Sequence, residues 1–123
     1  MKKKSKAKRM YFLVMYNLSQ IQKGIQAGHA ALEYSQKYKN DPEYLDFVKN
    51  HKTFIVLDGG SSGDMKKHLK TLNRWLIPCA EFREPDLNNS ISAIACVLDE
   101  DTYGAAVGMD TVNNFFRSFS LAR

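Results

Sequence analysis

An apolar run followed directly by a capped helix constrains the fold of this chain more than any other feature. Residues 11–16 form an unbroken apolar run, which is typical of a buried central strand with helices on both faces. Ser19 then begins a helix, and Gln22 three residues later completes a capping-box pattern. A buried strand that feeds a helix after a short turn is the opening unit of an α/β fold.

The helix that begins after Ser19 is rich in small residues. Ile21, Ile25 and Leu32 recur at helical spacing and predict one apolar stripe, with His29 on or beside it. Two glycines, Gly24 and Gly28, lie within the helix and cost roughly 1 kcal/mol each relative to alanine. We therefore expect close packing, or close approach of another group, along this helix.

The rest of the chain alternates between helical and extended patterns. Asp41 followed by Pro42 predicts the start of a second helix, with Tyr44, Leu45 and Val48 as its apolar side. The expected elements are a strand at 11–16, helices at 20–39 and from 42, a strand at 53–57, a helix at 64–75, strands at 79–83 and 92–98, and a short helix within 107–119. This order predicts a three-layer α/β/α fold with a small, about four-stranded, mixed sheet.

The helix at 64–75 has one apolar and one basic side. Met65, Leu69, Leu72 and Leu76 are expected to be buried. The basic side is most simply a solvated face, and it consists of Lys66, Lys67, Lys70 and Arg74.

Net charge is concentrated at the N-terminus. Residues 2–9 hold six of the 18 basic side chains, and the other 12 oppose 13 acidic ones. We expect residues 1–9 to be a disordered basic tail and residues 10–123 to be a single α/β domain. Such a tail can contact nucleic-acid phosphates, or it can serve only as a solubilising extension.

Several classes of protein do not fit the composition. No window approaches the ~20 apolar residues of a membrane span, and residues 11–16 are too short for a signal peptide, so we expect a cytoplasmic protein. Cys79 and Cys96 stand among apolar neighbours and are expected to be reduced core residues. His29, His51 and His68 are not spaced as zinc ligands, so no metal and no cofactor are expected.

Polar side chains follow two of the predicted strands. Ligands of open α/β sheets bind beyond the carboxyl ends of the strands, where segments 17–23 and 84–90 are expected. If the two strands are neighbours, one cleft holds Lys23, Glu84, Asp86, Asn88, Asn89 and Ser90. A lysine facing carboxylates over a helix N-terminus suits an anionic or carbonyl-bearing ligand, or a water held for attack on an ester. A structural ion pair between Lys23 and one of the acids is the alternative. For His29 the alternatives are a structural role and proton transfer.

Four residues of the first helix carry a resemblance. Gln26, His29, Ala30 and Ala31 match the helix motif of the type II (archaeal and eukaryotic-type) peptidyl-tRNA hydrolase family, and the segment 84–95 resembles that of its short bacterial and phage relatives. The resemblance covers about residues 10–100 and implies the fold of that family. It also implies cleavage of the ester between a peptidyl or N-blocked aminoacyl group and tRNA.

The resemblance assigns roles to residues of this chain. It implies catalytic roles for Lys23, for Glu84 or Asp86, and for Ser92, which matches a family threonine. Substrate-binding residues would be Gln22, Gln26, His29, Asn88, Asn89 and Ser90. The chain departs from the family in that the usual lysine aligns nearer Gln22 than Lys23, and the acidic loop lacks the family's arginine.

Three functional hypotheses follow. The first is a peptidyl-tRNA hydrolase-like esterase with tRNA as its partner and no membrane association. The second is a non-catalytic binding module of the same fold that recognises RNA, a nucleotide or a protein. The third is an interaction protein that uses the surface of residues 115–119, with a homodimer as one outcome.

Overall fold

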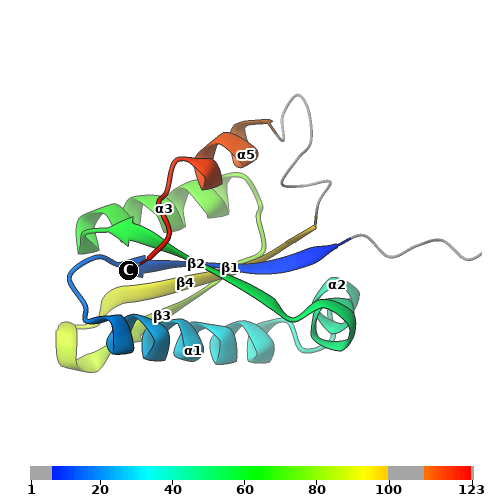
Figure 1. The fold of residues 1–123 in the computed structure, drawn as a ribbon, viewed down its shortest axis with the longest axis horizontal. Helices are drawn as coiled ribbons and strands as arrows, with labels where there is room; N and C mark the ends of the chain where they lie inside the picture. The colour runs from blue at the N-terminus through cyan, green and yellow to red at the C-terminus, as the bar shows by residue number, and fades with distance from the viewer. Residues whose placement is uncertain (1–6, 100–109, 123) are drawn as a thin grey trace, which may run out of the picture.

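The computed structural model describes residues 7–99 and 110–122, which form one sheet between two helical layers (Figure 1). The elements are β1 (Lys8–Met15), α1 (Gln20–Lys37), α2 (Pro42–Asp46), a π-helical turn (Phe47–His51), β2 (Thr53–Gly60), α3 (Ser62–Arg74), β3 (Ala80–Glu84), a 3₁₀ turn (Pro85–Leu87), β4 (Ser90–Asp99) and α5 (Asp110–Arg117). The predicted three-layer α/β fold with a small mixed sheet is confirmed.

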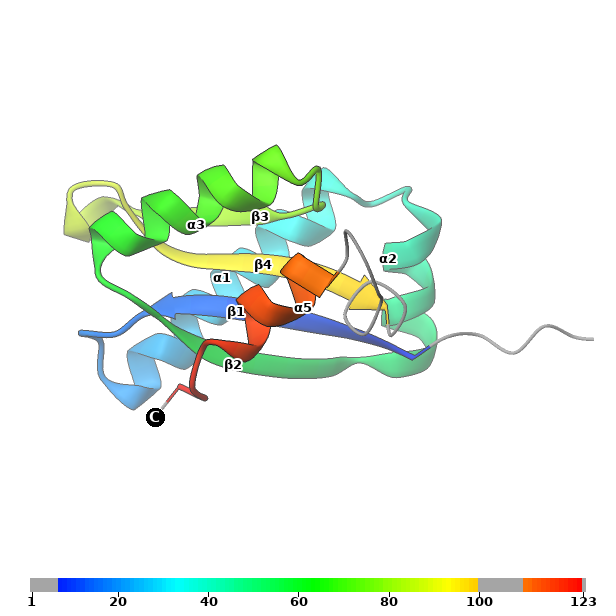
Figure 2. The same ribbon diagram turned by 90° about the horizontal axis from the view of Figure 1, so that it is seen from above.

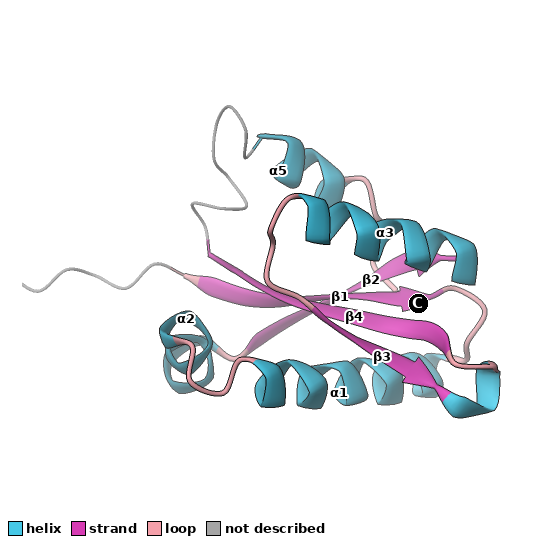
Figure 3. Cartoon of the chain, turned by 180° about the vertical axis from the view of Figure 1, so that it is seen from behind, coloured by secondary structure: helices cyan, strands magenta, loops and turns pink. Residues whose placement is uncertain are grey.

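The four strands lie in the order β2-β1-β4-β3. β1 runs parallel to β2 and antiparallel to β4, and β3 also runs antiparallel to β4. β1 is therefore a central strand, as its unbroken apolar sequence predicts. Figure 3 shows α3 and α5 on one face of the sheet and α1 and α2 on the other.

Successive side chains of β1 point to opposite faces of the sheet, so the strand contributes to the core on both faces. Tyr11, Leu13 and Met15 pack with α3 and Phe116, whereas Met10, Phe12 and Val14 pack with α1 and Phe47.

The prediction that Ile21, Ile25 and Leu32 form the buried stripe of α1 is wrong. These side chains are 77%, 45% and 68% exposed. α1 instead turns its opposite side to the sheet, and the buried residues are Lys23, Gln26, Ala27, Ala30 and Tyr34. The alanines of that side let the helix lie close to the large side chains of β1, and Gln26 is accommodated because it finds hydrogen-bond partners on the sheet.

Other helix predictions hold in part. Asp41 caps α2 through a hydrogen bond from the Glu43 amide, as predicted, but Leu45 and Val48 are 50% and 39% exposed. Leu76 is not buried by α3: it follows the helix in a left-handed conformation (φ 58°) and is 87% exposed. Met65 and Leu72 are buried and Leu69 is half-buried, while the basic residues of α3 face solvent as expected.

The caps of α1 and α3 also differ from expectation. Ser19 accepts a hydrogen bond from the Gln22 amide, which is one half of the predicted capping box. A complete box occurs at α3, where Ser61 and Asp64 bond each other's backbone amides. Serine and aspartate at these positions stabilise helix N-termini for the same reason, because they accept hydrogen bonds from unpaired amides.

The basic N-terminal segment is shorter than predicted, because Lys8 and Arg9 belong to β1. Lys8 is 8% exposed and forms ion pairs with Asp46 and, at 3.4 Å, with Glu43. Burial alone would lower the pKa of Lys8, but the Asp46 hydrogen bond and the Glu43 charge together raise it. Residues 1–6 lie outside the described part of the chain.

The C-terminal segment covers the α3 face and then joins the sheet edge. Phe116 is buried, and Phe115 and Phe119 are half-buried against the core, so most of the apolar surface of these rings is used for packing within the domain. Backbone hydrogen bonds then tie residues 120–122 to β2, from the Asp58 amide to Ser120 and from the Ala122 amide to Val56. The predicted positions 107–109 lie outside the described residues.

Two further findings concern the remaining sequence predictions. Cys79 and Cys96 are both buried and carry free thiols, as expected. Among the described helices, none is long and apolar enough to cross a bilayer.

Candidate functional site

The connectors that follow β1 and β3 lie at the same end of the sheet. This follows from the strand directions, because β1, β2 and β3 all run one way and β4 runs back. β1 and β3 are nevertheless not neighbours, since β4 lies between them. Figure 2 shows α1 crossing the sheet obliquely from the β2 side towards the β3 side, so the helix bridges that separation.

Gln26 links α1 to both strands on the far side. Its amide nitrogen Nε2 donates a hydrogen bond to Oε2 of Glu84 over 3.3 Å, and its oxygen Oε1 accepts one from the Ser92 hydroxyl. Because one end of the amide faces a carboxylate and the other a hydroxyl, the orientation of the amide is determined. The three residues form a hydrogen-bonded chain from the end of β3, through the helix, to the start of β4.

A bulge in β4 aims Ser92 at the helix. Phe82 pairs with Ala93, but the next residue, Arg83, pairs with Ile91, so Ser92 is an extra residue without a partner in this ladder. β-Bulges change the direction in which a side chain points and are frequent beside functional sites. Ser92 is fully buried and also lies 3.4 Å from the Phe82 carbonyl oxygen.

These hydrogen bonds matter for stability because two of the three residues are buried. Gln26 is 4% exposed and Ser92 0%, whereas Glu84 is half-buried at the rim. A buried amide that lost its partners would incur a desolvation cost of roughly 1–3 kcal/mol. The arrangement therefore holds one carboxylate oxygen of Glu84 in a defined position at the surface.

The acidic connector forms a tight turn that explains its asparagines. Asn88 and Asn89 have φ angles of 54° and 57°, and the Asn89 amide donates to the Glu84 carbonyl oxygen over 3.0 Å. Asparagine is among the few residues that adopt this left-handed conformation readily. Asp86 and both asparagines are exposed, while Ser90 is half-buried and pairs with Glu84 in the β3–β4 ladder.

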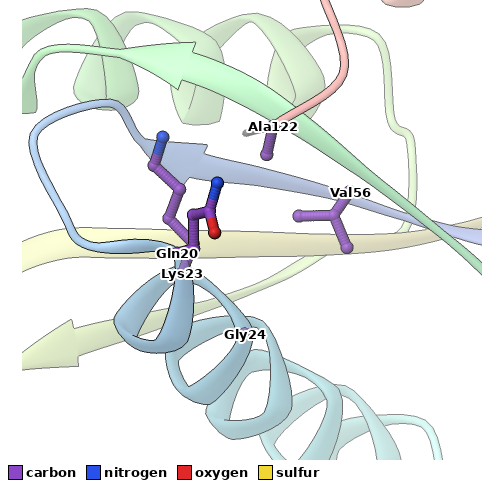
Figure 4. Close-up of a pocket in the computed structure, with 5 residues that line it drawn as sticks. All are labelled: Gln20, Lys23, Gly24, Val56 and Ala122. Atoms are coloured by element: carbon purple, nitrogen blue, oxygen red, sulfur yellow. The ribbon is translucent and has the colours of Figure 1, made fainter.

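Lys23 lies on the buried side of α1, beside a hollow towards β2, whereas Glu84 ends β3 at the opposite edge of the sheet. The hollow has a volume of about 280 Å³ and is lined by Gln20, Lys23, Gly24, Val56 and Ala122. Figure 4 shows the Lys23 and Gln20 side chains rising from the first turns of α1 towards the strands. Lys23 is only 7% exposed, although the hollow is open to solvent on one side.

The structure thus divides the predicted residues into two groups. Gln26, Glu84 and Ser92 come together through hydrogen bonds, with Ser90 beside Glu84 in the ladder. Lys23 is one turn of helix before Gln26 and lines the separate hollow described above. The α1 residue whose hydrogen bond to Glu84 is observed is Gln26, not the lysine that the sequence placed opposite the acids.

Two further residues that were predicted to bind substrate are His29 and Gln22. The His29 ring stacks on Phe82 with centroids 4.4 Å apart and an interplanar angle of 18°, which favours the structural alternative for this histidine. Gln22 is exposed, and its backbone amide caps the helix through Ser19. Its side chain lies near the site end of α1 and points to solvent.

Sequence reasoning missed several residues around Lys23. Val56 lines the hollow from β2, and Ala122 reaches it because residues 120–122 pair with that strand, a pairing that no local pattern in the sequence indicates. Gln20 could have been found, because it precedes Lys23 by three residues and so lies on the same side of the helix. The bulge at Ser92 likewise has no local signal.

Within residues 7–99 and 110–122, no three histidine, cysteine, aspartate or glutamate side chains are grouped as metal ligands would be. The polar groups at the site are a lysine, a carboxylate, amides and a hydroxyl.

Comparison with known proteins does not assign the chain to a family: no family model matches it, and no curated protein sequence is significantly similar to it.

Proposed function

We propose that this protein is an esterase that cleaves the bond between a peptidyl, or N-blocked aminoacyl, group and tRNA. The observation that carries the proposal is the hydrogen-bonded chain Glu84–Gln26–Ser92, which joins the motif helix to the acidic connector. It supports the proposal because the residues that resemble the type II peptidyl-tRNA hydrolase family on α1 contact the segment expected to carry the catalytic acid.

Glu84 is the proposed water-positioning group. Gln26 engages its Oε2 atom, so the second carboxylate oxygen can accept a hydrogen bond from a water that attacks the ester carbonyl. Asp86 stands two residues later on the exposed turn and is the alternative acid. Ser92 is buried, so its proposed role is to position Gln26 and not to contact the substrate.

Lys23 is the proposed electrophilic group. It stands in the first turn of α1, where the helix dipole also favours negative charge. A substrate carbonyl in the hollow beside Lys23 would gain stabilisation of its developing oxyanion from the ammonium. For the reaction proposed here, the carbonyl must then lie between this hollow and Glu84.

Contacts to the tRNA phosphates are proposed for two basic segments. Lys66, Lys67, Lys70 and Arg74 are exposed on α3, which begins at the same end of the sheet as the site. The lysines of residues 2–6 supply further charge. A tRNA ester as substrate would also imply a cytoplasmic location.

A binding module without turnover is the second candidate. The observation that favours it is that the hollow beside Lys23 lies towards β2, whereas Glu84 ends β3 at the opposite edge of the sheet. If no ester can engage both groups, the exposed basic face of α3 could still bind RNA.

A turnover assay separates the two candidates. The purified chain is incubated with peptidyl-tRNA, and release of free tRNA is followed over time. We expect release by the native protein, and about a 100-fold or greater loss of rate in both Lys23→Ala and Glu84→Gln, because both groups act in the transition state. Asp86→Asn tests whether the second acid takes part.

Glu81→Gln is the matched control, since it changes an acid on the same strand that pairs with Arg83 at the surface. It should retain the native rate. Binding of tRNA without release, unaffected by Glu84→Gln in a folded protein, would exclude the esterase and leave the binding module.

A further inference from the structure

The two cysteines of the chain face each other across β3 and β4. Ala80 pairs with Ala95 in the antiparallel ladder, so the same register, continued by one residue, brings Cys79 opposite Cys96. Both side chains are buried in the core on the α3 face of the sheet. Their thiols share a hydrogen bond. Two thiols in contact can lose two electrons and join as a disulfide, which no other pair of core side chains can do.

The backbone of Cys79 shows which kind of cross-strand pair the two residues form. Its amide donates a hydrogen bond to the Tyr38 hydroxyl over 3.2 Å, and its carbonyl oxygen accepts one from Lys37 Nζ over 2.9 Å. Both groups are thus directed to the end of α1 and away from β4. Cys79 and Cys96 are therefore a pair of the non-hydrogen-bonded kind.

Pairs of this kind suit a disulfide. Their Cα atoms are about 4.5 Å apart, and their side chains lie closer together than in hydrogen-bonded pairs. Disulfides usually join residues whose Cα atoms are about 4.4–6.8 Å apart. The bond between Cys79 and Cys96 can therefore form with little movement of the backbone. A separation near the lower limit favours a disulfide that a reductant can open again.

The two sulfur atoms differ in reactivity. The hydrogen bond from Cys96 lowers the pKa of the Cys79 thiol and the Lys37 charge adds to this effect, while burial opposes it. Burial raises the pKa of the Cys96 thiol, and so does its hydrogen bond to Cys79. Because the thiolate is the nucleophile, Cys79 is expected to react first. Its Sγ atom is oriented by a contact of 3.6 Å with Oδ1 of Asn73.

A hollow brings solvent close to the pair. It has a volume of about 350 Å³, and its lining includes Pro78 and Val97, which are the chain neighbours of Cys79 and Cys96. A hydrogen peroxide molecule is only slightly larger than water, so it can approach within one residue of the thiols.

We propose that Cys79 and Cys96 are a redox-sensitive pair, which a peroxide oxidises to a reversible disulfide. The Cys79 sulfur attacks one oxygen of hydrogen peroxide: an S–O bond forms, the O–O bond breaks, and the first water leaves with the thiol proton. The Cys96 sulfur then attacks the Cys79 sulfur: the S–S bond forms, the S–O bond breaks, and the second water leaves with the second thiol proton. The two sulfurs together lose two electrons, and the peroxide is reduced to two waters.

The disulfide would close a loop over residues 80–95, which carries Glu84 and Ser92. It joins the start of β3 to β4, whereas Glu84 stands at the other end of β3. The proposal is therefore independent of the esterase function, because neither thiol lies at the candidate site.

Mass spectrometry of the full native chain tests the proposal. The protein is treated with hydrogen peroxide, unfolded in urea and alkylated with iodoacetamide. We expect the chain to lose two hydrogen atoms, to take up no alkyl group on cysteine, and to give a cross-linked peptide pair containing positions 79 and 96. Dithiothreitol should restore both thiols. Two alkylated cysteines after the treatment, cross-links only between chains, or a cross-link that forms only in urea would overturn the proposal.

Variants test the order of the two steps. In Cys96→Ala the reaction should stop at the sulfenic acid of Cys79, which dimedone traps, whereas in Cys79→Ala the Cys96 thiol should stay reduced. Lys37→Gln keeps both cysteines and should slow the cross-link by roughly twofold or more. Lys39→Gln is its matched control, because Lys39 is an exposed lysine two positions later, and it should cross-link at the native rate. Equal rates in the two lysine variants, or dimedone on Cys96 in Cys79→Ala, would overturn the role of Cys79 as the nucleophile.

Discussion

The side-chain amide of Gln26 donates a hydrogen bond of 3.3 Å to the carboxylate of Glu84, which lies 58 positions away in the sequence. The contact joins the helix after the first strand to the connector after the third. This hydrogen bond defines the candidate site. The strand directions alone place the two segments at the same end of the sheet but do not bring them into contact.

The first prediction concerns this hydrogen-bonded chain. Gln26→Ala and Ser92→Ala should each lower the free energy of unfolding by about 1–3 kcal/mol, because each leaves a buried polar group without its partner. The double variant should lose less than the sum, with a coupling of about 0.5–3 kcal/mol. Urea unfolding measures all three, and Gln22→Ala, at an exposed position, should change stability by less than about 0.5 kcal/mol.

The second prediction concerns the C-terminal pairing with β2. A chain that stops at Phe119 lacks the two backbone hydrogen bonds that residues 120–122 make with Asp58 and Val56. It should lose roughly 1–3 kcal/mol of stability, at about 1 kcal/mol per bond plus lost packing. Hydrogen exchange should show faster exchange at the Asp58 amide but unchanged exchange in α1. Equal protection of Asp58 in both chains would refute the role of this pairing in solution.

The third prediction concerns the cap of α3 in acid. The Ser61 backbone and side-chain hydrogen bonds lower the pKa of Asp64 below its usual value. Its contribution to stability is therefore complete above the unfolded-state pKa and is lost as the pH falls through the folded-state pKa. Urea midpoints of native protein and Asp64→Ala should differ near neutral pH and converge in strong acid. A difference that stays constant over the whole acid range would contradict this account.

The fourth prediction concerns the N-terminal lysines. Deletion of residues 2–6 removes four positive charges and should weaken RNA binding and flatten its salt dependence, by up to about 0.7–0.9 logarithmic units per lost phosphate contact. Lys8 should be kept in the deletion, because it belongs to β1 and is paired with Asp46. Fluorescence anisotropy with a labelled tRNA gives the slope. An unchanged slope would show that these lysines do not contact the RNA.

The sequence predicts the order of elements well, because apolar runs and helix caps are local signals. β1 shows this most clearly, since six consecutive apolar residues predict a central strand between two layers. The rotation of α1 could not be predicted in the same way. Counting apolar residues favoured the side with Ile21, Ile25 and Leu32, but small alanines and a hydrogen-bonded glutamine made the opposite side the better match to the sheet.

The candidate site depends on contacts that local patterns do not encode. Glu84 was predicted at the correct end of the sheet from the carboxyl-end rule, but its partner on α1 was expected to be Lys23. The bulge at Ser92 and the edge pairing of residues 120–122 arise from long-range register, so neither could be read from nearby residues.

The edge pairing of residues 120–122 also affects how the protein can be handled in the laboratory. Ala122 borders the hollow of Lys23, so a fluorophore attached through a cysteine introduced at position 122 would lie next to that opening. A label at Ala7, which is exposed next to the start of β1 at the opposite end of the sheet, would leave the opening accessible.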